Sequence, residues 1–278
     1  MKNTKFIAIF ATAFALTTVF TSCQKDETAG TNDTLTGTTG DAAQSQLIGD
    51  EAIDASEEYA SNANFMSSGA QKVRSEVSRD SVEVSIVRPD SSAIVVNIDF
   101  GNQGIRGRRG NILKGELSVE INRSTFTRTI TYNNFSVNDN TIRGYRIVTK
   151  GRNDQNQITW NITSRDTILL KTGESKIWNS DRVRTLTNDN NTPSNPWDDV
   201  YSVTGSANGI NTKGKAYSLI IDSNNPLIFY TDYIHFVQGS MKISSEQKTA
   251  LLDYGDGTKD DKATIIIDGK TKDITLGK

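Results

Sequence analysis

The sequence has almost no cysteine or histidine, and this shortage limits its chemistry. Cys23 is the only cysteine and His235 the only histidine among 278 residues. One cysteine cannot form an internal disulfide, so the fold has to depend on its hydrophobic core. The usual zinc sites and cysteine nucleophiles need more of these residues than the chain contains. We therefore predict no cofactor, no metal site of the usual types and no catalytic residue.

The chain also has little net charge, −2 at pH 7. Proteins that bind nucleic acid through its phosphates carry a clear positive field. Arg106-Gly107-Arg108-Arg109-Gly110 is only a local basic cluster, which we interpret as a solvated loop rather than an anion site. Nucleic acid is therefore not an expected partner.

The one long apolar run lies at the N-terminus. Lys2 and Lys5 precede the apolar stretch Phe6 to Phe20, which is shorter than the roughly 20 residues of a membrane span. Small residues follow it, so the pattern predicts a secretory signal peptide over residues 1–22. Cleavage there leaves Cys23 first, an arrangement that resembles a bacterial lipobox, in which the thiol carries a diacylglyceryl group. Because several acyl chains anchor stably, the expected partner is a membrane. The alternative is a plain secretory signal with an incidental cysteine.

The four residues after Cys23 refine the expected location. Gln24, Lys25, Asp26 and Glu27 place a lysine and two acids just past the predicted lipidation site. This resembles the export signal of Bacteroidota-type surface lipoproteins. The resemblance implies the outer membrane, with the protein facing the cell exterior. The alternative is an ordinary charged start of a linker.

The rest of the chain divides by its periodicity. Residues 23–40 are rich in Thr, Gly and Asp and predict a flexible tether. Residues 41–78 predict one short helical segment that lies on the domain or acts as a stalk. From residue 79 to 278 apolar and polar residues alternate in short runs with Asn, Asp and Gly between them. This predicts an all-β antiparallel domain, as a large sandwich, an open barrel or a curled sheet. The clearest hairpin turns at Asp268-Gly269, a pair that accepts the positive φ angles of a type I′ turn.

Three C-terminal stretches carry a family resemblance: Trp197 to Ile221, Gly239 to Ser244, and Leu252 to Leu276. They resemble a group of uncharacterised Bacteroidota lipoproteins with a β-rich body that ends in a DYGDGT…DGK hairpin. The resemblance covers most of residues 41–278. Relatives often carry cysteines near two Asp-aromatic-Gly segments, but this chain has Lys259 in the later place, so a role tied to a disulfide there is not expected.

One long loop is the candidate binding site. Trp197, Asp198 and Asp199 lie in a loop broken by two prolines, and long loops often carry function. The tryptophan is suited to stacking on a glycan, and the acids to binding calcium, together with Asp189. The alternative is a tryptophan that packs the loop onto the sheet while the acids cap turns.

Other motifs favour ordinary structure. Residues 209–215 spell most of a P-loop, but the segment after them predicts a strand, so we interpret them as a hairpin turn. His235 lies in a predicted strand without a nucleophile motif, which favours a structural histidine. Thr34, Ser81 and Thr167 each stand between an aspartate and an aliphatic residue, which resembles the O-glycosylation signal of Bacteroidota secreted proteins.

Together these patterns predict a lipid-anchored, surface-exposed lipoprotein without catalytic activity, whose β body binds a glycan or protein ligand in an adhesin-like role. The first alternative is a structural component of the envelope. The second is a glycoside hydrolase that uses paired carboxylates, which requires two acids converging in one cleft.

Overall fold

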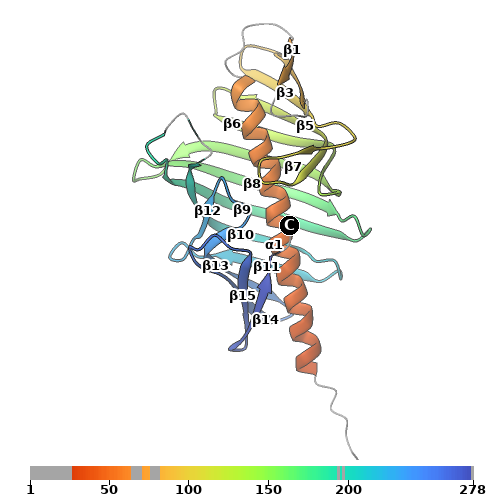
Figure 1. Cartoon of the computed structure of the whole chain (residues 1–278), viewed down its shortest axis with the longest axis vertical. Helices are drawn as coiled ribbons and strands as arrows, with labels where there is room; N and C mark the ends of the chain where they lie inside the picture. Colours follow the sequence, from red (N-terminus) through yellow and green to blue (C-terminus); the bar gives the residue numbers. More distant parts are fainter. Residues whose placement is uncertain (1–26, 64–70, 76–81, 193–194, 196–197, 277–278) are drawn as a thin grey trace, which may run out of the picture.

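The computed structural model describes residues 27–63, 71–75, 82–192, 195 and 198–276. Within these residues it contains one long helix, α1, and a single antiparallel sheet of 16 strands (Figure 1). The elements are α1 (Glu27–Ala63), β1 (Gln71–Ser75), β2 (Val82–Val87), β3 (Ala93–Asp99), β4 (Ile105–Arg106), β5 (Ile112–Asn122), β6 (Thr127–Val137), β7 (Asn140–Arg152), β8 (Ile158–Leu169), β9 (Ser175–Asn188), β10 (Val200–Ile210), β11 (Ala216–Ile221), β12 (Leu227–Tyr230), β13 (Phe236–Ser245), β14 (Lys248–Asp256), β15 (Lys262–Ile267) and β16 (Lys270–Thr275).

The sheet follows chain order and does not close. Its order is β1-β2-β3-β5-β6-β7-β8-β9-β10-β11-β13-β14-β15-β16, with β4 beside β5 and β12 between β10 and β13. Every neighbouring pair is antiparallel, which confirms the predicted all-β class. Because all strands belong to one open sheet, the curled-sheet and open-barrel alternatives describe the fold and the two-layer sandwich does not.

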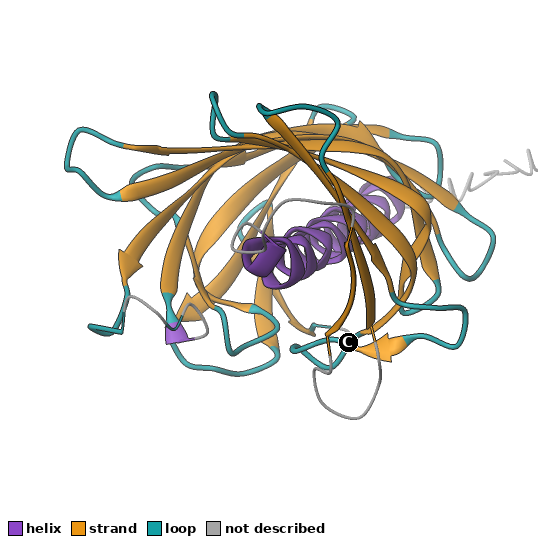
Figure 2. Cartoon of the chain, turned by 90° about the horizontal axis from the view of Figure 1, so that it is seen from above, coloured by secondary structure: helices purple, strands orange, loops and turns teal. Residues whose placement is uncertain are grey.

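The sheet curls around α1, which lies on its concave side (Figure 2). The strands turn alternate side chains toward the helix, as in β2, where Val82, Val84 and Ile86 are buried and their neighbours are not. From the helix, Leu35, Ile48 and Ile53 join the same core as the strands. The N-terminal end of α1 extends beyond the sheet (Figure 1).

The helix differs from the prediction in both length and position. It spans Glu27–Ala63, so it begins inside the segment 23–40 predicted as a flexible tether and ends before residue 78. β1 (Gln71–Ser75) also lies in the segment predicted as helical. The tether prediction rested on missing apolar periodicity. Polar contacts explain the difference, because Asn211 donates to the Thr38 hydroxyl and the Thr212 backbone N–H donates to Asp41.

Local turn chemistry was predicted correctly. Asp268 and Gly269 have φ angles of 51° and 74°, as a type I′ turn requires, and they join β15 to β16. Two similar Asp-aromatic-Gly segments also share one turn. Asp99 accepts from the Gly101 N–H and Asp253 accepts from the Gly255 N–H, at 2.7 and 2.8 Å. The same hydrogen bond in both turns therefore accounts for the similarity of the two segments.

The basic cluster at residues 106–110 is only in part the solvated loop that we predicted, because Arg106 and Arg108 are exposed but Arg109 is not. The side chain of Arg109 is only 5% exposed and pairs with Asp54 of α1. Arg108 donates to Glu58 of the same helix at 2.8 Å. This pairing could not be predicted from local sequence patterns, because the helix and the loop lie about 50 residues apart in the chain.

Candidate functional site

Ion pairs hold α1 in the curl of the sheet. The helix contains no lysine or arginine, and strand β9 presents Lys176, Arg182 and Arg184 to it. Arg182 donates to both carboxylate oxygens of Asp50, at 3.2 and 2.7 Å, with both side chains almost fully buried. Burial alone would raise the pKa of Asp50, but Arg182 and Arg184 outweigh it and hold the pKa below its usual value. Further polar contacts to the helix are those of Lys176 with Gln44 and Asp41, Arg184 and Arg109 with Asp54, Arg128 with Glu57, Arg108 with Glu58, and Asn111 with Glu51.

A second buried ion pair lies directly against the helix backbone. Arg146 of β7 and Asp166 of β8 pair with no side-chain exposure, and Arg146 also donates to the Tyr132 hydroxyl at 2.9 Å. The guanidinium occupies the space where a Cβ atom would stand at Gly49. Glycine at this position therefore lets the helix approach the charged face of the sheet.

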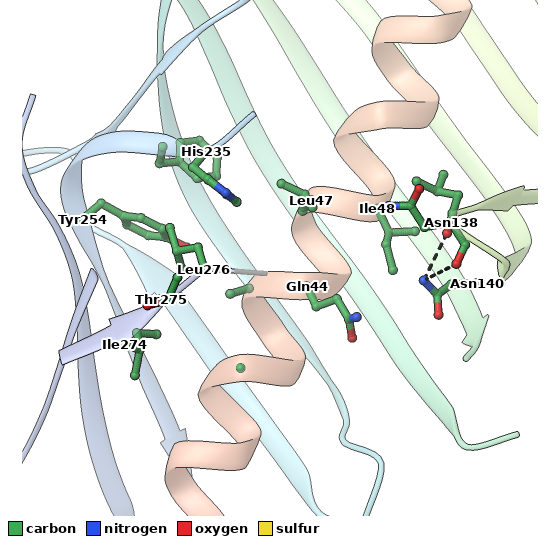
Figure 3. A pocket seen from close by; sticks show the side chains of 14 residues that line it. Gln44, Leu47, Ile48, Asn138, Asn140, His235, Tyr254, Ile274, Thr275 and Leu276 are labelled. Carbon is green, nitrogen blue, oxygen red and sulfur yellow. Dashed lines mark hydrogen bonds between the residues drawn. The ribbon is translucent and has the colours of Figure 1, made fainter. Parts of the chain in front are cut away.

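The seam, defined as the gap between strand β16 and the β6–β7 hairpin, contains the candidate site. A cavity of about 270 Å³ lies there against α1 (Figure 3). Ligand pockets commonly start near this size and have mostly apolar walls with a few polar groups. The lining residues come from the helix (Gly40, Ala43, Gln44, Leu47, Ile48), the hairpin (Val137, Asn138, Asn140), the segment before and into β13 (His235, Phe236), β14 (Tyr254) and the end of the chain (Ile274, Thr275, Leu276).

Some polar groups of this cavity are already hydrogen-bonded within the protein, and one can still bond a ligand. Asn138 accepts from the Ile112 N–H and donates to Asn111, and Asn140 donates to the Val137 carbonyl, so both amides hold the hairpin in shape. Burial raises the pKa of Tyr254, and the charge of Asp50 adds to the shift, so its hydroxyl stays protonated. Among the described residues no group bonds this hydroxyl, although the side chain is only 5% exposed. It is therefore available to a ligand.

A row of aromatic rings leads across the concave face to the cavity. Trp160, Tyr201, Phe229, Phe236 and Tyr254 contact one another in turn, with centroid distances of 5.4, 6.2, 6.0 and 5.4 Å. The guanidinium of Arg109 stacks over Phe229 at 4.0 Å. Since Arg109 comes from the loop between β4 and β5, this contact connects that loop to β12.

The predicted lipidation residue and all but one of the predicted export residues lie outside the described part of the chain. Cys23, Gln24, Lys25 and Asp26 are outside the described residues, and Glu27 is described only as the first residue of α1. Within the described residues, no helix is both long and apolar enough to cross a membrane.

The predicted ligand-binding loop is described only in part, because Trp197 lies outside the described residues. Both oxygens of Asp198 accept from the Thr192 hydroxyl at 2.9 Å, and Asp199 accepts from the Tyr201 hydroxyl at 2.8 Å. Burial raises the pKa of Asp199. These contacts match the alternative in which the acids stabilise the loop. The structure does not bring Asp198 and Asp199 to the seam cavity.

The three predicted glycosylation positions differ in accessibility. Ser81 is outside the described residues, and Thr34 is a partly buried residue of α1. Thr167 is exposed near the C-terminal end of β8, but its neighbours Asp166 and Ile168 are buried. An enzyme that reads all three residues would therefore have to act on Thr167 before the sheet forms.

A second group of acids lines an open groove on β14 to β16. Asp253, Asp256 and Asp260 each accept a backbone N–H two residues ahead, from Gly255, Thr258 and Lys262, and Asp273 accepts from the Thr264 hydroxyl. These carboxylates therefore cap turns and strand pairs. Across the described part of the chain, no cluster of three or more His, Cys, Asp or Glu side chains is arranged to hold a metal ion.

Comparisons of the chain with protein-family models, with curated proteins and with solved structures found no match. The site therefore has to be interpreted from its own geometry. Sequence reasoning missed the seam cavity, although it singled out His235, which lines it. The available signal was weak, since the lining residues come from segments as far apart as Gly40 and Leu276.

Proposed function

We propose that the mature chain is a lipid-anchored, surface-exposed binding protein without catalytic activity, and that its ligand or partner binds at the seam. The cavity between α1, the β6–β7 hairpin and β16 carries this proposal. Its walls are mostly apolar, and the free Tyr254 hydroxyl gives it one directional contact. The anchor and the surface location rest on the residues from Cys23 to Glu27.

We expect the cavity to bind a small apolar probe. N-phenyl-1-naphthylamine should show a saturable rise in fluorescence with the wild-type protein, because the apolar walls exclude water from the dye. Ala43→Phe fills the cavity from the helix and should remove most of this signal. Ala216→Phe adds the same ring at the exposed first position of β11 and serves as the control. An equal signal from all three proteins would contradict binding at the seam.

We also expect the protein to be exposed on intact cells. Protease should cleave the wild-type protein without lysis, whereas a variant with Lys25, Asp26 and Glu27 all changed to Ala should be protected until the cells are lysed. Immunoblotting with an antibody against the β domain measures the cleavage of both proteins. Protection of the wild type would contradict surface export, and a structural component facing the periplasm would then become the better proposal.

Neither the groove acids on β14 to β16 nor the loop acids Asp198 and Asp199 support the hydrolase alternative. The groove acids on β14 to β16 are bonded to their own turns, and Asp198 and Asp199 are bonded to Thr192 and Tyr201. A general acid and its partner carboxylate instead need oxygens that face a substrate.

A further inference from the structure

We propose that the free edge of β16 and the seam cavity together form a docking site for an extended, acidic peptide strand from a partner protein. This inference rests on the proposed binding function and specifies its partner. Among the described residues, β16 is the last strand of the sheet and pairs only with β15. Exposed strand edges accept added strands through backbone hydrogen bonds, while adjacent pockets select the side chains.

The hairpin geometry shows which backbone groups are free. In a hairpin closed by a two-residue turn, the residues that flank the turn exchange both backbone hydrogen bonds, and bonded pairs then alternate along the strands. Ile267 and Lys270 flank this turn. Lys270, Lys272 and Ile274 therefore direct their backbone groups toward β15. Thr271, Asp273 and Thr275 direct theirs toward the open edge, where a partner strand can bond them.

The same alternation assigns the side chains to faces. Ile274 pairs with buried Ala263 and lines the cavity, so it lies on the concave face, as do Lys272 and Lys270 two and four residues before it. Both lysines are exposed, and among the described residues neither makes an ion pair. Unpaired lysines at an edge discourage pairing with another copy of the same edge. They favour a partner strand that places acids opposite them.

Besides the two acids opposite Lys270 and Lys272, the cavity specifies the side chain at a third position of the partner strand. It opens beside Ile274 and Leu276, and the small residues Gly40 and Ala43 leave room over the helix. An apolar side chain opposite Ile274 would fill it, with the acids opposite Lys272 and Lys270 at two and four residues along the same face. The expected pattern in an antiparallel partner is therefore apolar-x-acid-x-acid.

The test uses a labelled peptide, Thr-Leu-Thr-Glu-Thr-Glu-Thr, and the full mature protein purified in detergent. Fluorescence anisotropy should show saturable binding. The peptide with lysine in place of both glutamates should bind about tenfold more weakly, because two attractive cross-strand pairs become repulsive. No saturable binding, or equal binding of both peptides, would overturn the proposal.

Two substitutions separate strand addition from simple occupation of the cavity. Thr271→Pro removes a backbone N–H from the free edge, keeps the pairing with β15, and should weaken peptide binding about tenfold. Thr271→Val retains the N–H and should bind as the wild type does. If Ala43→Phe weakens binding and Thr271→Pro does not, the seam binds ligand but strand addition is wrong. Thermal unfolding of each variant confirms that the fold is retained.

Discussion

Replacing Asp50 with alanine should lower the free energy of unfolding by about 3–5 kcal/mol, because it leaves buried arginines without their partner. Asp50 accepts from both terminal nitrogens of the Arg182 guanidinium, and one of its oxygens lies 4.0 Å from the guanidinium of Arg184. The low pKa of this carboxyl shows that the folded protein favours its charged form. Urea unfolding, followed by circular dichroism, measures the change.

The control for this result is an exposed pair. Asp181 lies 3.2 Å from Arg165 on the outer face of the sheet, with 61% of its side chain exposed. Asp181→Ala should therefore lower stability by less than about 1 kcal/mol. The double variant of Asp50→Ala with Arg182→Ala should lose less than the sum of the two single changes. Equal losses for Asp50→Ala and Asp181→Ala would show that the buried pair does not hold the helix.

Gly49→Ala should destabilise the protein by about 2–4 kcal/mol, although alanine is the better helix former. The added Cβ would overlap the guanidinium of Arg146, which cannot move without leaving Asp166 and Tyr132. A loss of buried ion pairing would therefore add to the overpacking. The thermal midpoint and the urea midpoint should both fall.

Gly37→Ala is the matched control on the same helix. A Cβ at Gly37 would meet no atom within 4 Å, so the change should stabilise the protein by about 0.5–1 kcal/mol through helix propensity alone. Opposite signs for the two glycines would confirm that the sheet contacts the helix at Gly49. A stabilising Gly49→Ala would mean that the helix does not dock as described.

The strands were predictable because each one carries its own signal. Val82, Val84 and Ile86 alternate with polar neighbours, and Asp268-Gly269 accepts the positive φ angles of a type I′ turn. Burial on one face of a sheet produces this alternation at every strand. The all-β class and the hairpin at Asp268-Gly269 therefore followed from short stretches of sequence.

The candidate site could not be predicted in this way. Ile274 and Leu276 resemble ordinary strand residues, and Gly40 and Ala43 resemble parts of a tether or helix. Only the closing of the curl brings them to one cavity. Asp198 and Asp199 gave a stronger signal in the sequence, but their hydrogen bonds show that they serve the loop itself.

The sequence by itself determined the antiparallel β body and its clearest hairpin, because each depends on neighbours in the chain. Only the tertiary structure decided that α1 extends from Glu27 to Ala63 with part of its length inside the curl, and that the described sheet stays open at β16. The physical reason is that long-range ion pairs add to the apolar contacts that Leu35, Ile48 and Ile53 make with the strands. Asp50 and Asp54 look like solvent-exposed residues until Arg182 and Arg184, about 130 residues later, are brought against them.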